Sequence, residues 1–244
     1  MTVLLKLGGS VITEKDQAET ADEKTLDRIA ETIAARAPEE LVLVHGGGSF
    51  GHHYAAKHGV SRTDGTHDAT AIREINDAMR RLNGTVIDRL AGAGVDPLPV
   101  HPLSVGSRDA AGGLTLPVAG VGTMLAEGFV PVTHGDVISH AGRGATIISG
   151  DELIVSLAES LGAERVGLCS AVPGVLDTDG EVIDRIETFE AVAPALGASE
   201  ETDVTGGMAS KVKTLLDCEF PADIFGVDDL AAFLAGDHPG TLIE

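Results

Sequence analysis

The sequence predicts an α/β protein with a mostly parallel β-sheet covered by helices on both faces. Short apolar runs alternate with amphipathic stretches along the chain, as they do in proteins built from βαβ units. Glycine-rich turns directly follow two of the apolar runs, and sheets of this kind bind ligands beyond the carboxyl ends of their strands. The 244 residues suit one large α/β domain or two small ones fused tightly.

The expected strands are short apolar runs, and the expected helices have apolar residues on one face. The helical spacing is clearest in the segment Asp68–Leu90, where apolar residues recur every three or four positions from Ile72 onward. We expect strands at Val3–Leu7, Leu41–Val44, Pro97–Val100, Phe129–Thr133, Ala145–Ile148, Arg165–Cys169 and Ala222–Phe225. We expect helices at Asp22–Arg36, Asp68–Leu90, Glu152–Leu161, Gly207–Leu216 and Leu230–Leu234.

The charge balance excludes several classes of function. Asp and Glu number 38 against 17 Lys and Arg, and the formal net charge of -21 argues against binding of nucleic acids or anionic membranes. We interpret this acidity as a solvation adaptation of the kind that halophilic proteins carry. No run approaches the roughly 18 apolar residues of a membrane span. The N-terminal segment does not resemble a signal peptide, and Cys169 and Cys218 form neither a disulfide framework nor a metal-ligand spacing, so we expect a cytoplasmic protein.

Two glycine-rich turns are the strongest local signal. Lys6 to Ser10 reads KLGGS and His45 to His52 reads HGGGSFGH, and each turn follows an expected strand. Glycines let backbone N–H groups approach phosphate oxygens closely. A single Gly-Gly pair is usually a tight turn, but two such turns, one with a lysine and one with a histidine, favour an anion site.

Two other nucleotide-binding motifs fit poorly. Gly46, Gly48 and Gly51 match the G-x-G-x-x-G dinucleotide fingerprint. That motif also needs an acidic residue at the end of a strand about 20 residues later. In this chain that position lies near Asp68, in a polar segment that opens an expected helix. The chain contains no P-loop sequence.

Two further segments join the candidate site. Thr205 to Lys211 reads TGGMASK and opens an expected helix, so Lys211 would lie in the first turns of that helix. The helix dipole disfavours a cation at this end unless phosphates are bound there. Ser149, Gly150 and Asp151 follow an expected strand, and N-capping of the next helix would by itself explain Asp151.

The first segment extends from Lys6 to Thr13 and reads KLGGSVIT. In their order and spacing, the four segments together resemble the amino acid kinase superfamily. The histidine that ends HGGGSFGH is similar to that of the isopentenyl phosphate kinases and the related fosfomycin kinases. The resemblance implies a three-layer αβα sandwich in which residues 1–244 form a single amino acid kinase domain. Its N-terminal part would hold the phosphate acceptor, and its C-terminal part, from about residue 150, would hold the nucleotide. It also implies a homodimer.

For the chemistry, the resemblance implies transfer of a phosphoryl group from ATP, with Mg²⁺, to the phosphate of isopentenyl phosphate. Lys6, Lys15, His52 and Lys211 would be the catalytic residues. Lys15 would stabilise transition-state charge, and His52 would donate a hydrogen bond to the acceptor phosphate, unless it is a structural histidine under the turn. The ATP phosphates would contact Lys6, Leu7, Gly8, Gly9, Ser10, Gly48, Gly206 and Lys211.

The acceptor phosphate would contact Gly47, His52 and Gly150, and Asp151 would orient the lysines. The helix Asp68–Leu90 would form the wall of an apolar slot for the isoprenoid tail, with Ile72, Ile75, Met79 and Leu82 either lining the slot or packing in the core. The resemblance names no protein ligand for a metal ion.

The sequence departs from the family at the nucleotide loop, which in many relatives reads T-D-V-D-G-V-Y. Here Ala171 and Pro173 occupy the two acidic positions, and Gly174 is retained. Base recognition would then depend on backbone groups, or the nucleotide preference would be looser. Two alternatives remain open: a kinase of the same fold for another phosphate or phosphonate such as fosfomycin, and a nucleotide-binding regulatory domain without catalysis.

Overall fold

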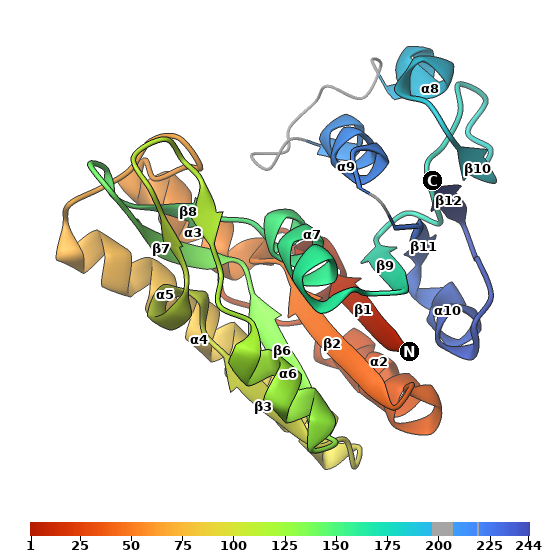
Figure 1. Ribbon diagram of the computed structural model, residues 1–244, viewed down its shortest axis with the longest axis horizontal. Coiled ribbons are helices and arrows are strands. Elements are labelled where there is room, and N and C mark those ends of the chain that lie inside the picture. Colours follow the sequence, from red (N-terminus) through yellow and green to blue (C-terminus); the bar gives the residue numbers. More distant parts are fainter. Residues whose placement is uncertain (197–206, 219) are drawn as a thin grey trace.

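The computed structural model describes residues 1–196, 207–218 and 220–244, and it has three layers (Figure 1). In this part of the chain, a central sheet contains eight strands in the order β10-β12-β11-β9-β1-β2-β6-β3. All of its pairings are parallel except that of β11 with β12. In chain order its strands are β1 (Thr2–Leu7), β2 (Glu40–His45), β3 (Pro97–Val100), β6 (Val130–His134), β9 (Arg165–Ser170), β10 (Arg185–Ile186), β11 (Ala222–Gly226) and β12 (Thr241–Ile243).

The helices are amphipathic segments that cover both faces of this sheet. Asp22 and Asp68 accept hydrogen bonds from backbone N–H groups as the N-caps of α2 and α4, which is why these helices begin where the sequence predicts. The helices are α1 (Gly9–Ile12), α2 (Glu23–Arg36), α3 (Gly48–His58), α4 (Ala69–Gly92), α5 (Pro102–Val105), α6 (Ala119–Ala126), α7 (Gly150–Leu161), α8 (Phe189–Leu196), α9 (Gly207–Leu216) and α10 (Leu230–Ala235), with a 3₁₀ turn at Val227–Asp229.

The alternation of side chains along the central strands divides the core in two. Leu5 of β1 and Leu43 of β2 pack in a core with α2, α4 and α10, whereas Leu4 and Val44 pack on the opposite face with α6, α7 and α9. Because Lys6 is two residues from Leu4, its side chain lies on the α7 face. This two-sided burial confirms the predicted three-layer αβα sandwich.

A second, four-stranded sheet was not predicted. Its order is β5-β4-β7-β8, and its strands are β4 (Ser107–Arg108), β5 (Leu114–Thr115), β7 (Asp136–His140) and β8 (Gly144–Ile148). The expected strand Ala145–Ile148 therefore forms, but it pairs in antiparallel fashion with β7, outside the central sheet. A third apolar cluster, containing Val60, Ile75 and Val137, fills the space between this sheet, α3 and α4.

Candidate active site

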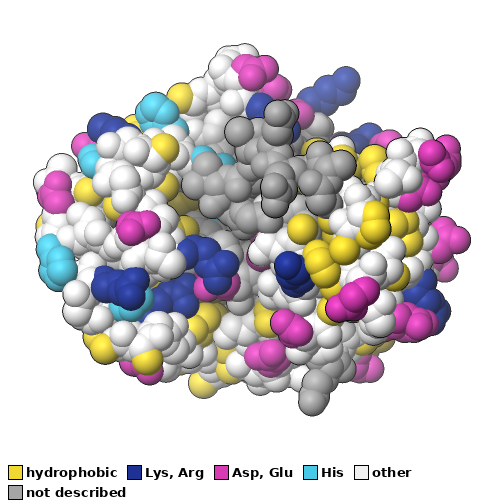
Figure 2. Space-filling view, turned by 90° about the horizontal axis from the view of Figure 1, so that it is seen from above, with side chains coloured by type: hydrophobic (Ala, Val, Ile, Leu, Met, Phe, Trp, Pro, Cys, Tyr) yellow, Lys and Arg dark blue, Asp and Glu magenta, His cyan; other side chains and the backbone are white. Residues whose placement is uncertain are grey.

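The glycine-rich turns meet because three parallel strands end at the same edge of the central sheet. Leu7 pairs with His45 of β2 on one side and with Cys169 of β9 on the other. The first residue of each turn continues this register: Gly46 N–H donates to the Leu7 carbonyl at 3.0 Å, and Gly8 N–H donates to the Cys169 carbonyl at 2.9 Å. Figure 2 looks onto this end of the molecule and shows lysine and arginine side chains on it, although the chain as a whole is strongly acidic.

The backbones of the two turns touch, and only glycine permits this contact. A Cβ atom on Gly9 would lie 2.3 Å from the Gly48 nitrogen, and one on Gly46 would lie 2.7 Å from the Gly9 nitrogen. Gly48 has φ +47°, in the left-handed region that favours glycine. Helix α3 begins at Gly48, so the N–H groups of its first turn lie beside the α1 turn. In this first turn the Phe50 and Gly51 N–H groups donate to the Gly47 carbonyl at 3.1 and 3.0 Å. The backbone N–H groups of the glycines themselves, Gly9, Gly47 and Gly48, are therefore the donors of this edge that suit phosphate oxygens.

A single hydroxyl group joins the two turns. Thr13 Oγ1 donates to the Gly9 carbonyl at 2.8 Å and accepts the Ser49 N–H at 3.0 Å. The Thr13 residue is only 4% exposed. The hydroxyl therefore holds the lysine turn and the histidine turn at a defined separation, a role that the sequence did not reveal.

Lys6 points into the same region from β1. Its residue is 6% exposed, and its Nζ lies 2.8 Å from Asp151 Oδ1 at the start of α7. A Cβ atom on Gly150 would lie 3.0 Å from Lys6 Cε and 3.4 Å from the His45 carbonyl oxygen. Gly150 thus leaves room for the lysine, and Asp151 keeps a buried ammonium paired.

The capping explanation for Asp151 is wrong. Ser149 is the N-cap of α7, and it forms a reciprocal capping box with Glu152, so α7 begins at Gly150, two residues earlier than expected. Glu152 also accepts from Arg108 Nη2 at 2.6 Å and lies 3.2 Å from Arg62 Nε. Asp151 is therefore available to pair with Lys6, and the two arginines stabilise the cap beside it.

A row of three histidines extends from His45, at the start of the second glycine turn, across β6 to the segment after β3. The rings of His45 and His134 stack with centroids 5.5 Å apart, and His101 Nδ1 lies 3.0 Å from His134 Nε2. Burial lowers the pKa of His45, and it lowers the pKa of His134 to about 3, so both rings are neutral. His45 Nε2 lies 3.1 Å from Asn83 Oδ1, and Gly135 N–H donates to the His45 carbonyl at 2.9 Å. The row is a structural support of the turn that the sequence did not reveal.

The other predicted residues lie on three separate elements. His52 is an exposed residue of α3, one helical turn after Gly48 and on the same side of the helix. Lys15 is exposed in the loop that the bridge between Thr13 and Ala21 closes. Lys211 is a partly buried residue of α9. Helix α9 packs against α8 and β12, near the edge of the central sheet that β10 forms (Figure 1). Gly206 lies outside the described residues.

The altered nucleotide loop retains its glycine because of packing. A Cβ atom on Gly174 would lie 2.7 Å from Thr241 Oγ1, which accepts the Val175 N–H at 2.8 Å. Ala171 and Pro173 are exposed at the carboxyl end of β9. This loop therefore offers backbone groups, and no acidic side chains, at the two substituted positions.

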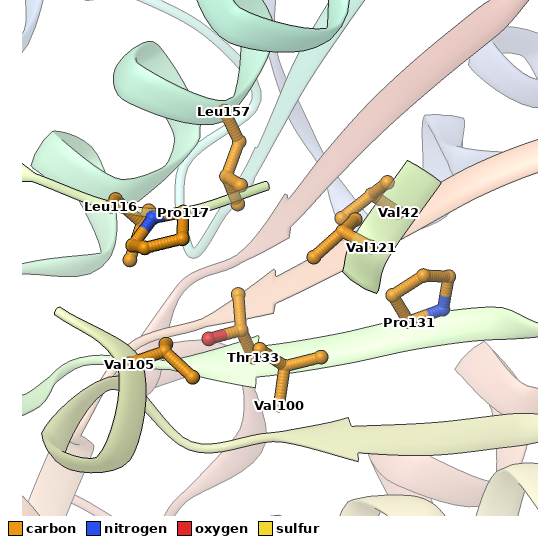
Figure 3. A pocket seen from close by; sticks show the side chains of 9 residues that line it. All are labelled: Val42, Val100, Val105, Leu116, Pro117, Val121, Pro131, Thr133 and Leu157. Carbon is orange, nitrogen blue, oxygen red and sulfur yellow. The ribbon is translucent and has the colours of Figure 1, made fainter. Parts of the chain in front are cut away.

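An apolar cavity on the α6–α7 face does not form part of this site. It is lined by Val42, Val100, Val105, Leu116, Pro117, Val121, Pro131, Thr133 and Leu157 (Figure 3). Its volume of about 10 Å³ is near the minimum for one water molecule, so it is a packing defect of the core.

The described residues contain neither a metal-binding cluster of acidic, His or Cys side chains nor a membrane-spanning helix. Within residues 1–196, 207–218 and 220–244, no group of three or more His, Cys, Asp or Glu side chains could hold a metal ion. In the same part of the chain, no helix is both long enough and apolar enough to cross a membrane.

Comparison with known proteins gives consistent matches over the chain. The model of the amino acid kinase family matches residues 1–219. The isopentenyl phosphate kinase of Haloferax volcanii is 62% identical over 243 residues, covering 99% of this chain and 98% of that protein. The isopentenyl phosphate kinase of Methanothermobacter thermautotrophicus is 35% identical over 229 residues, covering 88% of this chain and 85% of that protein. A crystal structure of isopentenyl phosphate kinase superimposes with a TM-score of 0.85 at 28% identity and covers all of both chains.

Proposed function

The chain belongs to the amino acid kinase family, and we propose that it phosphorylates isopentenyl phosphate with ATP to give isopentenyl diphosphate. One observation of the structure carries the proposal: two glycine-rich backbone turns touch each other beside a buried, carboxylate-paired lysine. Such an edge suits two anionic groups that must approach closely, because backbone N–H groups and ammonium charge offset their repulsion. The 62% identity with the Haloferax volcanii kinase supports this choice of acceptor.

In the proposed reaction, an oxygen of the acceptor phosphate attacks the γ-phosphorus of ATP. The bond from that phosphorus to the β–γ bridging oxygen breaks, and ADP leaves. The second pKa of a phosphate monoester is about 6, so near neutral pH the acceptor is already largely a dianion and needs no strong base. Catalysis then depends on positioning and on charge neutralisation.

The proposed roles involve both glycine turns and three further segments. We assign the acceptor phosphate to Gly47, Gly150 and a hydrogen bond from His52, and transition-state charge to Lys6 and Lys15. Asp151 orients Lys6, since it is the residue that pairs with Lys6 in the structure. The ATP phosphates are assigned to Lys6, Leu7, Gly8, Gly9, Ser10, Gly48, Gly206 and Lys211. We propose that the N-terminal part of the single domain holds most of the acceptor and that the part from about residue 150 holds the rest of the nucleotide. The first glycine turn and Gly48 reach across to the ATP phosphates, and Gly150 reaches across to the acceptor phosphate.

Mg²⁺ is proposed to enter as its ATP complex. A nucleotide-bound Mg²⁺ is held mainly by phosphate oxygens and water, which suits a site whose nearby carboxylate, Asp151, is engaged by Lys6. When bound, the ion neutralises charge on the phosphates.

The apolar tail is proposed to lie against the third apolar cluster. Ile75 belongs to that cluster and Ile72 packs against it while remaining partly exposed. Met79 belongs to the main core and is 1% exposed, so it is assigned to packing beneath the acceptor turn, where its Sδ would lie 3.3 Å from a Cβ atom on Gly47. Leu82 belongs to the main core and is fully buried, so it is assigned to packing.

We extend the proposal to the setting of the enzyme. The net charge of -21 and the Haloferax relative support a cytoplasmic, salt-adapted protein. A homodimer is the family expectation, and light scattering at molar KCl tests it.

A coupled assay of ADP release tests the function. We expect turnover with isopentenyl phosphate and dimethylallyl phosphate only when Mg²⁺ is present. Turnover restricted to fosfomycin would reassign the acceptor. ATP binding without turnover of any of these compounds would instead indicate a regulatory domain.

A further inference from the structure

The loop that carries Lys15 contains an unusual backbone conformation. Among the residues that the structure describes, Glu19 is the one non-glycine residue with φ in the left-handed region, at 52°. A bulky residue adopts this conformation only when surrounding contacts stabilise it, and such residues concentrate at functional sites.

The contacts that hold Glu19 come from two helices. The Tyr54 hydroxyl of α3 donates to Glu19 Oε1, and Arg81 of α4 donates to Oε2 from Nη2 at 2.6 Å and from Nε at 3.1 Å. The hydrogen bond from Tyr54, together with Arg81, lowers the pKa of Glu19, so the carboxylate is ionised near neutral pH. The Glu19 N–H also donates to the Ser49 carbonyl at 3.4 Å.

These contacts fasten the loop to the acceptor side of the site. The Glu14 N–H donates to the Thr20 carbonyl at 2.9 Å and closes the loop at its base. Ser49 and Tyr54 both belong to α3, the helix that begins at Gly48 and carries His52. Glu19 therefore ties the loop containing Lys15 to the helix that carries the proposed acceptor ligand.

We propose that Glu19 is a positioning residue, which fastens the loop through Tyr54 and Arg81 so that the Lys15 ammonium meets the reacting phosphates. The inference rests on the proposed function, because it assumes that Lys15 stabilises the transition state. A loop that could sample other conformations would bring the ammonium to the phosphates in only a fraction of encounters. The alternative is an ordinary ion pair that affects stability alone, since the Glu19 side chain is 30% exposed and that of Arg81 is 51% exposed.

Isosteric variants separate these two roles. Glu19→Gln removes the charge, and Tyr54→Phe removes only the donor, so the second variant keeps the test valid if the first folds poorly. Each is expected to lower kcat roughly tenfold, while the KM for isopentenyl phosphate changes less than about twofold. The matched control is Asp27→Asn, because Asp27 of α2 accepts from Arg89 of α4 at 3.0 Å, a carboxylate–arginine pair to the same helix that does not involve the loop. This control is expected to leave kcat unchanged.

A double-mutant cycle with Lys15→Ala links the effect to the lysine. Lys15→Ala is expected to lower kcat about 100-fold. Adding Glu19→Gln to that variant should cause no further loss, because the residue to be positioned is gone. Hydrogen exchange gives a readout without activity: amides of residues 14–20 should exchange faster in Glu19→Gln and not in Asp27→Asn.

The outcomes distinguish the inference from its premise. Full activity of Lys15→Ala refutes the role of Lys15 and the inference with it. An impaired Lys15→Ala together with fully active Glu19→Gln and Tyr54→Phe refutes the inference alone. Effects that multiply in the double variant also overturn it, since they show that Glu19 acts independently of Lys15.

Discussion

Replacing Asp136 with Asn should change how the stability of the protein depends on pH. Asp136 is 2% exposed at the start of β7, and its carboxylate oxygens accept from Asn76 Nδ2 at 2.7 Å and from Val137 N–H at 2.8 Å. Burial raises the pKa of Asp136 from 3.8 to about 7. Two residues away, burial lowers the pKa of His134 from 6.5 to about 3.

The signs of the two effects are opposite. For Asp136, the folded-state pKa lies above the unfolded value, so its contribution is fully present below about pH 4 and is lost as the pH rises to about 7. For His134, the folded-state pKa lies below the unfolded value, so stability is lost as the pH falls from 6.5 toward 3. Between about pH 4 and 6.5, each state holds one proton on this pair: on His134 when unfolded and on Asp136 when folded. The pair therefore adds almost no pH dependence to the wild-type protein in this range.

Asp136→Asn removes the titration of Asp136 and leaves that of His134, so the two effects no longer cancel. A pKa rise from 3.8 to about 7 corresponds to a loss of about 4 kcal/mol in unfolding free energy between pH 4 and 7. The unfolding free energy of Asp136→Asn, relative to that of wild type, should thus increase by several kcal/mol across this range. His45 and His101 are unchanged in both proteins, so their titration cancels in the difference.

Urea unfolding at constant KCl concentration, followed by circular dichroism from pH 4.5 to 8, measures this difference directly. His134→Gln serves as the reciprocal variant, and its stability relative to wild type should increase as the pH falls. A difference between Asp136→Asn and wild type that stays constant with pH would refute the assignment of a neutral, buried carboxyl group.

Four other predictions concern the active site. Thr13→Val should lower kcat by about tenfold, whereas Thr13→Ser should keep a kcat near that of wild type, because the hydroxyl group is what joins the two turns. Equal kinetics of the two variants would contradict this role. His52→Ala should lower kcat about 100-fold with an unchanged melting temperature, since His52 is exposed; near-normal turnover would remove it from the mechanism. Asp151→Asn should lower kcat and destabilise the fold by about 3 kcal/mol, since it leaves Lys6 buried without a countercharge, and a melting temperature equal to that of wild type would argue against the pairing. Lys211→Ala should raise the KM for ATP, and an unaltered ATP dependence in steady-state assays would exclude Lys211 from the nucleotide site.

Much of the fold followed from local patterns in the sequence. The sequence predicted that the two glycine-rich segments are turns whose backbones approach phosphate oxygens closely. The structure confirms the turns and adds that Gly9, Gly46 and Gly48 bring the two backbones into contact with each other. The apolar spacing of α4 and its Asp68 cap are likewise local signals, since the residues involved are neighbours along one helix. The second sheet was missed because β4 and β5 are two residues long and carry no alternating pattern.

The site was predicted less completely because its key contacts join distant segments. From the residues alone Asp151 looked like a helix cap, and only the family resemblance linked it to the lysines. Its partner in the structure is Lys6, 145 positions away. Thr13 ends the segment KLGGSVIT and Glu19 lies in a polar loop, and the sequence does not show which groups either side chain contacts. The histidine row joins strands β2 and β6 with the segment after β3, so its members never appear as a motif.

The sequence by itself determined the layered α/β architecture and the glycine turns, because backbone conformation and side-chain periodicity are local properties. Only the tertiary structure decided which side chain neutralises Lys6, which hydroxyl joins the turns, and which carboxylate fastens the Lys15 loop. Burial makes each polar group require a partner, but the partner is whichever group the packing of remote segments brings within hydrogen-bond distance.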